Sequence, residues 1–181
     1  TPLYSSAASD VYKRQNINKM KNEKIKLDSI DLTILSELQK NGKISNVELA
    51  HIVNISPPSC LRRVKSLENR NFIRGYNAIL NPELLGFKVT VFAHVGLESQ
   101  AETDLKIFEN YISLFPEVRE CYMLVGEVDF LLKIVAKDWD HFQTFLTKNL
   151  TQAPKVSNVK TSLNIRSIKS LPEIPFEIMS E

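Results

Sequence analysis

The stretch NISPPSCLRRVKSLENRNFI, residues 54–73, places two prolines directly before a run of basic and apolar residues. Ser56 is a favoured N-cap, and Pro57 suits the first helical position because its missing N–H would have no partner there. The prolines therefore predict the start of a helix over residues 57–69. At about 100° per residue, one face of this helix collects its apolar members, which are Cys60, Leu61, Val64 and Leu67.

The opposite face of the same helix is polar and basic. Arg62 lies almost opposite the apolar arc. Around Arg62 the helical wheel places Ser59, Ser66 and Asn69, and on the two flanks it places Arg63 and Lys65. Arginine bonds bidentately to guanine, serine bonds to a base edge or a phosphate, and a helix N-terminus favours a phosphate. An ordinary amphipathic helix with a solvated basic face is the alternative. We expect one face to pack and the other to enter the major groove of double-stranded DNA.

Two shorter helices are predicted ahead of this one. Asp28 can cap the segment 28–41, and Gly42 is expected to end that helix in the left-handed conformation common after a C-cap. Ser45 and Glu48 form a capping box for the second helix. The segment FIRGYNAIL, residues 72–80, is expected to be a strand. Three helices and a strand predict a winged helix-turn-helix over residues 27–80.

The pattern changes after the segment LNPELLGF, where Pro82 and Gly86 predict a hinge over residues 81–87. Alternating apolar residues then indicate strands, and apolar residues at helical spacing indicate helices. In chain order they are a strand at 88–97, a helix at 102–114, strands at 117–125 and 128–136, a helix at 139–150 and a strand at 159–165. This β-α-β-β-α-β order predicts a ferredoxin-like, RAM-type domain over residues 88–170 and an α+β protein overall.

The two ends of the chain are expected to lie outside these domains. Residues 1–26 have no sustained period and are expected to be disordered or a non-native leader, with Met20 as a candidate native start. Residues 171–181 contain Pro172 and Pro175 and are expected to form an extended tail.

Composition limits the classes of function. The chain has 43% hydrophobic and 24% charged residues, as soluble globular proteins do, and we expect no membrane segment because no apolar run approaches roughly 20 residues. Cys60 and Cys121 are isolated, which argues against a disulfide framework and for a reduced, cytoplasmic compartment. Residues 28–80 contain seven Lys/Arg against five Asp/Glu, and residues 81–181 contain ten against fourteen. A polyanion would therefore favour the first domain, although an uneven solvated surface is the alternative.

The sequence offers no candidate catalytic centre. It has no phosphate-binding loop, no dinucleotide-binding glycine pattern and no G-x-S-x-G element. His51, His94 and His141 are scattered over two domains, so neither a metal site nor an acid–base pair is indicated. We expect a protein that is not an enzyme and has no cofactor.

The segment LDSIDLTILSELQKNGKISNVELAHIVNISPPSCLRRVKSLENRNFIRGYNAILNP, residues 27–82, resembles the DNA-binding domain of the Lrp/AsnC family. The segment VRECYMLVGEVDFLLK, residues 118–133, is similar to the Gly-x-x-Asp loop of that family. The resemblance extends over residues 27–170. It implies a sequence-specific transcription regulator that forms dimers and octamers or similar assemblies, and that responds to an amino acid such as leucine.

Site residues follow from the resemblance by position. The positions implied to contact DNA are Ser56, Pro58, Ser59, Arg62, Arg63, Lys65, Ser66 and Arg70. The positions implied to bind the effector are Gly126, Glu127, Val128 and Asp129, with Thr161 and Ser162 on the last strand. Val128 departs from the family, which often has an aromatic residue there.

The chemistry of the loop can also be assessed from its residues alone. Gly126 permits a turn and leaves its N–H accessible, and Asp129 can accept hydrogen bonds from an α-ammonium. Glu127 and Asp129 would face the same side if the loop were extended. A hairpin turn with two solvated carboxylates is the alternative. Two other functions stay open, namely a chromosome-organising protein that wraps DNA and an amino-acid-binding regulatory subunit of a metabolic enzyme.

Overall fold

The structure is a computed structural model that describes residues 27–170 and 174–176. The predicted leader at residues 1–26 lies outside the described residues. The chain divides into two compact units. Among the described residues, the first unit, called here the helical unit, comprises residues 27–78 and 174–176. The second, the sheet unit, comprises Ile79–Leu171.

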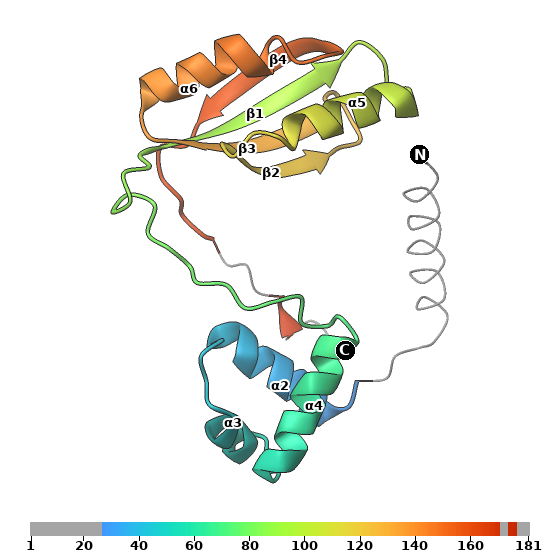
Figure 1. Cartoon of the computed structure of the whole chain (residues 1–181), viewed down its shortest axis with the longest axis vertical. Helices are drawn as coiled ribbons and strands as arrows, with labels where there is room; N and C mark the ends of the chain where they lie inside the picture. Colours follow the sequence, from blue (N-terminus) through green and yellow to red (C-terminus); the bar gives the residue numbers. More distant parts are fainter. Residues whose placement is uncertain (1–26, 171–173, 177–181) are drawn as a thin grey trace, which may run out of the picture. The chain divides into compact units, whose positions relative to one another are not determined.

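The helical unit contains α2 (Ser29–Lys40), α3 (Asn46–Ile52) and α4 (Pro57–Asn69), drawn in blue to green in Figure 1. The predicted caps of the first two helices are confirmed. An Asp28 carboxylate oxygen accepts the Asp31 N–H at 2.8 Å. In the capping box, Ser45 Oγ accepts the Glu48 N–H at 3.2 Å and the Glu48 carboxylate accepts the Ser45 N–H at 3.0 Å.

Two local expectations in this unit are wrong. Helix α2 ends at Lys40 and its C-cap residue Asn41 has extended backbone (φ −143°), so the left-handed glycine cap expected at Gly42 does not form. The Asn41 N–H bonds to the Glu37 carbonyl at 2.9 Å instead. No strand forms over residues 72–80, because no second strand pairs with this segment among the described residues.

The segment after α4 is held by side chains instead of strand pairing. The Arg70 guanidinium lies over the Phe72 ring, 4.9 Å from its centroid. The Tyr76 hydroxyl donates to the Glu68 carboxylate at 3.0 Å. Burial, followed by this bond, raises the pKa of Tyr76 to about 12, so the phenol stays a donor at neutral pH. These contacts return the chain alongside α4.

The core of the helical unit is small and lies between its three helices. Its buried members are Ile34, Leu49, Ala50, Val53, Cys60 and Leu67. Val64 packs against this core as predicted, whereas Leu61 is 44% exposed. Leu61 was expected to face inward, and that expectation is wrong because α2 and α3 cover less of α4 than the apolar arc of the wheel.

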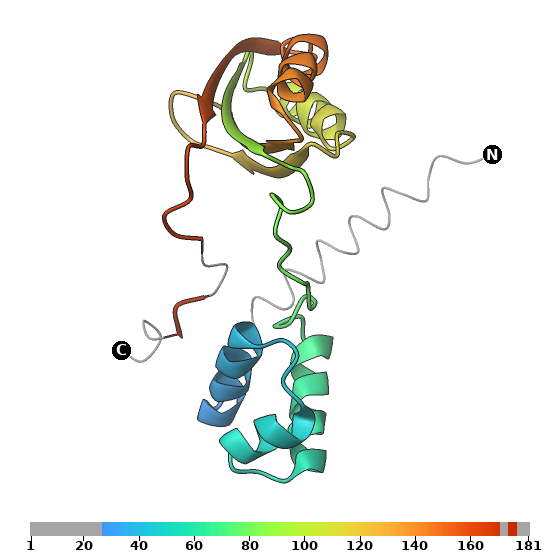
Figure 2. The same ribbon diagram turned by 90° about the vertical axis from the view of Figure 1, so that its left-hand side faces the viewer.

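The sheet unit follows the predicted order of strands and helices. Its elements are β1 (Val89–Leu97), α5 (Glu102–Ile112), β2 (Val118–Met123), β3 (Phe130–Ala136), α6 (Trp139–Phe145), the π-helical turn η1 (Leu146–Leu150) and β4 (Val156–Leu163). The strands form one antiparallel sheet in the order β2-β3-β1-β4. Helices α5 and α6 cover the same face of this sheet, as Figure 2 shows, which is the ferredoxin-like arrangement.

The alternation predicted for β1 is confirmed. Val91, Ala93 and Val95 are buried beneath the helices, where Phe108 and Phe130 stack with their ring centroids 4.8 Å apart. The last strand behaves differently, because Thr161 and Leu163 are exposed at the edge of the sheet. None of the described helices is long and apolar enough to cross a membrane.

Candidate DNA-binding surface and effector loop

The outward face of α4 forms a shallow groove. It is lined by Pro58, Leu61, Arg62, Lys65, Ser66, Asn69 and Arg70. Arg62 and Lys65 are exposed one helical turn apart, and Ser66 stands beside them. The groove therefore combines three cationic side chains, short polar groups and one exposed aliphatic side chain.

The predicted DNA-contacting residues at the N-terminus of α4 differ in their exposure to solvent. Ser56 is the N-cap residue and is exposed, but its side chain makes no cap hydrogen bond. Pro58 is exposed and Ser59 is half-buried. The Asn46 amide on α3 donates to the Pro57 carbonyl at 2.8 Å, which fixes the first turn of α4 against the preceding helix.

Arg63 does not extend from this face. Its guanidinium donates to Asp28 at 2.8 Å and to Asp31 at 2.7 Å. Hydrogen bonding to Asp31, and then to Asp28, raises the pKa of Arg63. The backbone N–H of Asp31, and then Arg63, lowers the pKa of Asp28. The Arg63 side chain thus joins α4 to the start of α2 in this structure.

The predicted effector loop connects β2 to β3, and Asp129 anchors it. The Asp129 carboxylate is buried and accepts the Leu97 N–H at 2.7 Å and the Gln100 side-chain amide at 2.9 Å. The Asp129 N–H donates to the Val95 carbonyl at 3.0 Å. Both carboxylate oxygens are therefore occupied by the end of β1 and the segment that follows it.

Of the other loop residues, Gly126 and Glu127 are exposed and Val128 is half-buried. Gly126 has φ +151°, which few other residues adopt, and Glu127 is exposed. The loop is not extended, so the condition under which Glu127 and Asp129 would face the same side is not met, and Asp129 is buried while Glu127 is exposed. On β4, Thr161 pairs with Ala93 and Ser162 with Phe92, so the two side chains lie on opposite faces of the sheet.

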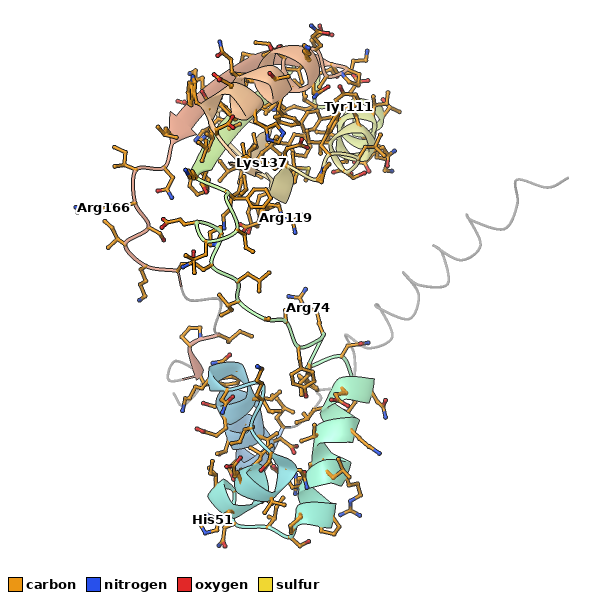
Figure 3. All side chains as sticks on the ribbon, turned by 60° about the vertical axis from the view of Figure 1, so that its left-hand side comes forward. His51, Arg74, Tyr111, Arg119, Lys137 and Arg166 are labelled. Atoms are coloured by element: carbon orange, nitrogen blue, oxygen red, sulfur yellow. The ribbon has the colours of Figure 1, made fainter. Side chains whose placement is uncertain are left out.

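The three histidines are kept apart. His51 lies on the exposed end of α3 and points away from the helical unit, as Figure 3 shows. His94 lies on β1, and His141 contacts Glu117 at 3.2 Å. Within residues 27–170 and 174–176, no three His, Cys, Asp or Glu side chains gather in a way that could hold a metal ion.

Two residues that belong to the α4 groove or hold the β2–β3 loop were not predicted from the sequence. Leu61 belongs to the groove on α4, and Gln100 holds the loop through Asp129. The wheel assigned Leu61 to the core by its chemistry. No local pattern marks Gln100, because its partner lies 29 residues away.

Comparisons with known proteins agree with this geometry. Residues 27–74 match the family model described as winged helix-turn-helix DNA-binding, and residues 90–174 match the model of the Lrp/AsnC ligand binding domain. The chain is 46% identical over 151 residues to the leucine-responsive regulatory protein of Rhizobium meliloti, covering 83% of this chain and 97% of the relative. It is 38% identical over 143 residues to the protein of the same name from Escherichia coli K12, covering 79% and 87%.

Solved structures give the same result. A transcriptional regulator from Neisseria meningitidis, determined in complex with L-Met, superposes with a TM-score of 0.81 at 34% identity, over 85% of this chain and 99% of the other. An AsnC family regulator from Agrobacterium tumefaciens superposes with a TM-score of 0.79 at 32% identity, over 84% and 99%. The chain therefore belongs to the Lrp/AsnC family of transcriptional regulators, with a helix-turn-helix DNA-binding domain followed by a ligand-binding domain of the Lrp/AsnC type.

Proposed function

We propose that α4 enters the major groove and that Arg62 reads a base edge there. The remaining contacts come from Ser56, Pro58, Ser59, Leu61, Lys65, Ser66 and Arg70. The observation that carries this proposal is the groove on α4, in which Arg62 and Lys65 stand exposed while Arg63 is tied to α2. An arginine fork matches guanine O6 and N7, and the exposed Leu61 is suited to a thymine methyl group.

Self-association completes the DNA-binding surface in this proposal. The face of the sheet opposite α5 and α6 carries Phe92, Leu131 and Val135, which are half-buried in one copy of the chain. Tyr122 is half exposed on the same face. A second copy packed on this face would bury these side chains and pair two α4 helices, which suits half-sites about 34 Å apart. Larger assemblies, such as an octamer, would join such dimers.

The effector in this proposal is an amino acid with an apolar side chain, such as leucine or methionine. The names of the relatives support this choice, because one group is called leucine-responsive and one structure contains L-Met. With Asp129 committed to the fold, Glu127 is the loop carboxylate free to accept an α-ammonium. Val128 replaces a bulkier family residue, and Gly126 offers its backbone. Thr161 and Ser162 are the proposed polar partners on β4.

The DNA proposal is tested by fluorescence anisotropy with duplex DNA at several salt concentrations. Each neutralised phosphate should contribute about −0.9 to the slope of log affinity against log salt. Arg62→Ala should cost ~1–3 kcal/mol on the preferred sequence and relax the preference at one position. Lys65→Ala should reduce the slope by about 1 and leave the preference intact.

Arg166→Ala is the matched control, since Arg166 is exposed and lies in the sheet unit. It should leave the binding unchanged. Affinity that does not depend on salt would contradict the proposal. Equal affinity for all sequences would instead favour a protein that wraps DNA without reading it.

The effector proposal is tested by thermal shift with each of the twenty amino acids. A ligand at 100 times its dissociation constant should stabilise the protein by about 2.7 kcal/mol. Glu127→Gln should abolish the shift, whereas Glu98→Gln, an equally exposed change on the segment after β1, should preserve it. A thermal shift that persists in Glu127→Gln would show that another residue binds the α-ammonium group.

A further inference from the structure

A short piece of the C-terminal segment lies on the helical unit. Ile174 bonds to the side chain of Gln39 on α2 through both of its backbone groups. The Gln39 amide nitrogen donates to the Ile174 carbonyl at 2.8 Å, and the Gln39 amide oxygen accepts the Ile174 N–H at 3.0 Å. Figures 1 and 2 both show this short red segment beside α2.

The segment sits in a groove of the helical unit. One wall of the groove comes from α2 and the other from the chain that follows α4. The apolar and aromatic lining residues of these two walls are Leu27, Leu35, Leu38, Phe72, Ile73 and Tyr76, and Ile174 and Phe176 of the segment itself also line the groove. Leu35, Leu38 and Ile73 also pack against the core of the unit, so the groove floor is a continuation of that core. Phe176 is half-buried there, whereas the Ile174 side chain is 61% exposed.

The bonding pattern explains what kind of ligand the groove accepts. A paired strand exchanges an N–H and a carbonyl with its neighbour, and the Gln39 amide presents the same two groups from one side chain. The chain after α4 forms no strand that could do so. The groove therefore recognises an extended backbone, with an aromatic side chain two residues further on as its apolar anchor.

Pro175 favours this bound shape before contact is made. The residue before a proline is restricted to extended backbone, so Ile174 is already extended in the free segment. Proline itself has no N–H to leave unpaired. Both features lower the conformational entropy lost on binding.

We propose that this groove is a docking site for the chain's own C-terminal segment, with Gln39 as the backbone clamp and Phe176 as the anchor. The occupant is this chain because its own residues 174–176 are bonded there. A covalent connection also gives the segment an effective concentration that a separate peptide would lack. The helical unit is then joined to the sheet unit by two connections, one through residues 79–88 and one through the docked segment.

A consequence for DNA binding rests on the proposed function. A helical unit held at two points has less freedom to adjust to the separation of two half-sites than one held at a single point. Release of the segment should therefore widen the range of half-site spacings that the protein accepts. Docking of the segment is tested without DNA. A failure of the DNA-binding proposal would therefore leave the docking proposal testable, and the reverse also holds.

The first test is disulfide trapping in the full chain. Asn77→Cys and Ile174→Cys, at two positions that line the groove, are combined in a Cys121→Ser background, which leaves Gln39 and the buried Cys60 in place. We expect an intramolecular cross-link that forms at least tenfold faster than in a control pairing Val47→Cys, exposed on α3, with Ile174→Cys. Equal rates for the two pairs would overturn the proposal. Cross-linked dimers in place of monomers would overturn the assignment to the same chain.

The second test leaves the tail unmodified. Gln39→Leu removes both hydrogen bonds at similar volume, and Gln143→Leu makes the same change on the exposed side of α6. We expect the exchange of the Ile174 amide hydrogen to quicken at least tenfold with Gln39→Leu and to stay unchanged with Gln143→Leu. Phe176→Ala should have the same effect as Gln39→Leu. An Ile174 amide that exchanges freely in the unsubstituted chain would overturn the docking.

Discussion

The outward face of α4 and the open face of the sheet are opposite kinds of surface. The first presents Arg62, Lys65 and Ser66, which water solvates well in a single copy of the chain. The second presents the half-buried apolar side chains of Phe92 and Leu131, beside their strand partners Lys133 and His94. In the proposed assembly, the first face would contact DNA and the second would be buried against a second copy of the chain. In such a regulator, DNA recognition and self-association would use two different surfaces.

If the two surfaces act separately, the helical unit and the sheet unit should have independent hydrophobic cores. Phe108→Ala tests this independence. Phe108 is fully buried in the sheet unit, so its truncation should cost that unit about 3–5 kcal/mol. Trp139 is the one tryptophan of the chain and reports on the sheet unit by fluorescence during denaturation. Ile107→Ala, at a neighbouring exposed position, should change little. A parallel loss in the helical unit, followed by exchange of α2 amides, would show that the cores are coupled.

The next effect concerns the open face of the sheet. Leu131→Asp places a charge where the proposed dimer is apolar, and burying an unpaired charge is strongly unfavourable. We expect the variant to sediment as a monomer at concentrations where the unchanged protein is a dimer. Ile165→Asp, at a 92% exposed position beyond β4, is the matched change. Association that persists in Leu131→Asp would place the interface on another surface.

A third comparison is between Arg62 and Arg63 on α4. The two residues are adjacent in sequence, but Arg63 bonds to α2 and its N-cap, whereas Arg62 is proposed to contact DNA. Arg63→Met should lower the melting temperature of the helical unit by several degrees, since it removes the bonds to Asp28 and Asp31. Arg62→Ala should weaken DNA binding without changing that temperature. The two variants are compared by circular dichroism and by anisotropy. A common loss of both stability and affinity in each variant would erase the distinction.

The smallest expected effect is a dependence on pH in the helical unit. The pKa of Asp28 is lowered by the Asp31 N–H and then by Arg63, and the pKa of Glu48 is lowered by its bonds with Ser45. A lowered pKa in the folded state stabilises the fold above the ordinary carboxyl value of about 4. That stabilisation is lost as the pH falls through the folded pKa. Asp28→Asn keeps the cap and should flatten the acid limb of the melting curve.

The parts of the fold that were predictable from the sequence are those that depend on near neighbours along the chain. The cap at Asp28 and the capping box at Ser45 involve residues three apart, and the alternation in β1 is a property of one strand. The family follows from the same segments.

The parts that were not predictable depend on partners far away in the sequence. Arg63 finds Asp28 and Asp31 more than thirty residues earlier, and Asp129 finds Leu97 at a similar separation. A helical wheel has no information on how much of α4 the other helices cover, which is why Leu61 was placed inward. The expected strand at residues 72–80 had suitable residues but no strand to pair with.

The buried thiol of Cys60 can be used to measure how often the helical unit opens. Its thiol is fully buried in the core of the helical unit, and this burial raises its pKa. A thiol reagent therefore reaches Cys60 only during a transient opening of that unit, whereas Cys121 is exposed in the closed state. The rate of modification at Cys60 counts these openings, and its slowing when DNA or an amino acid is added would report ligand binding without any attached label.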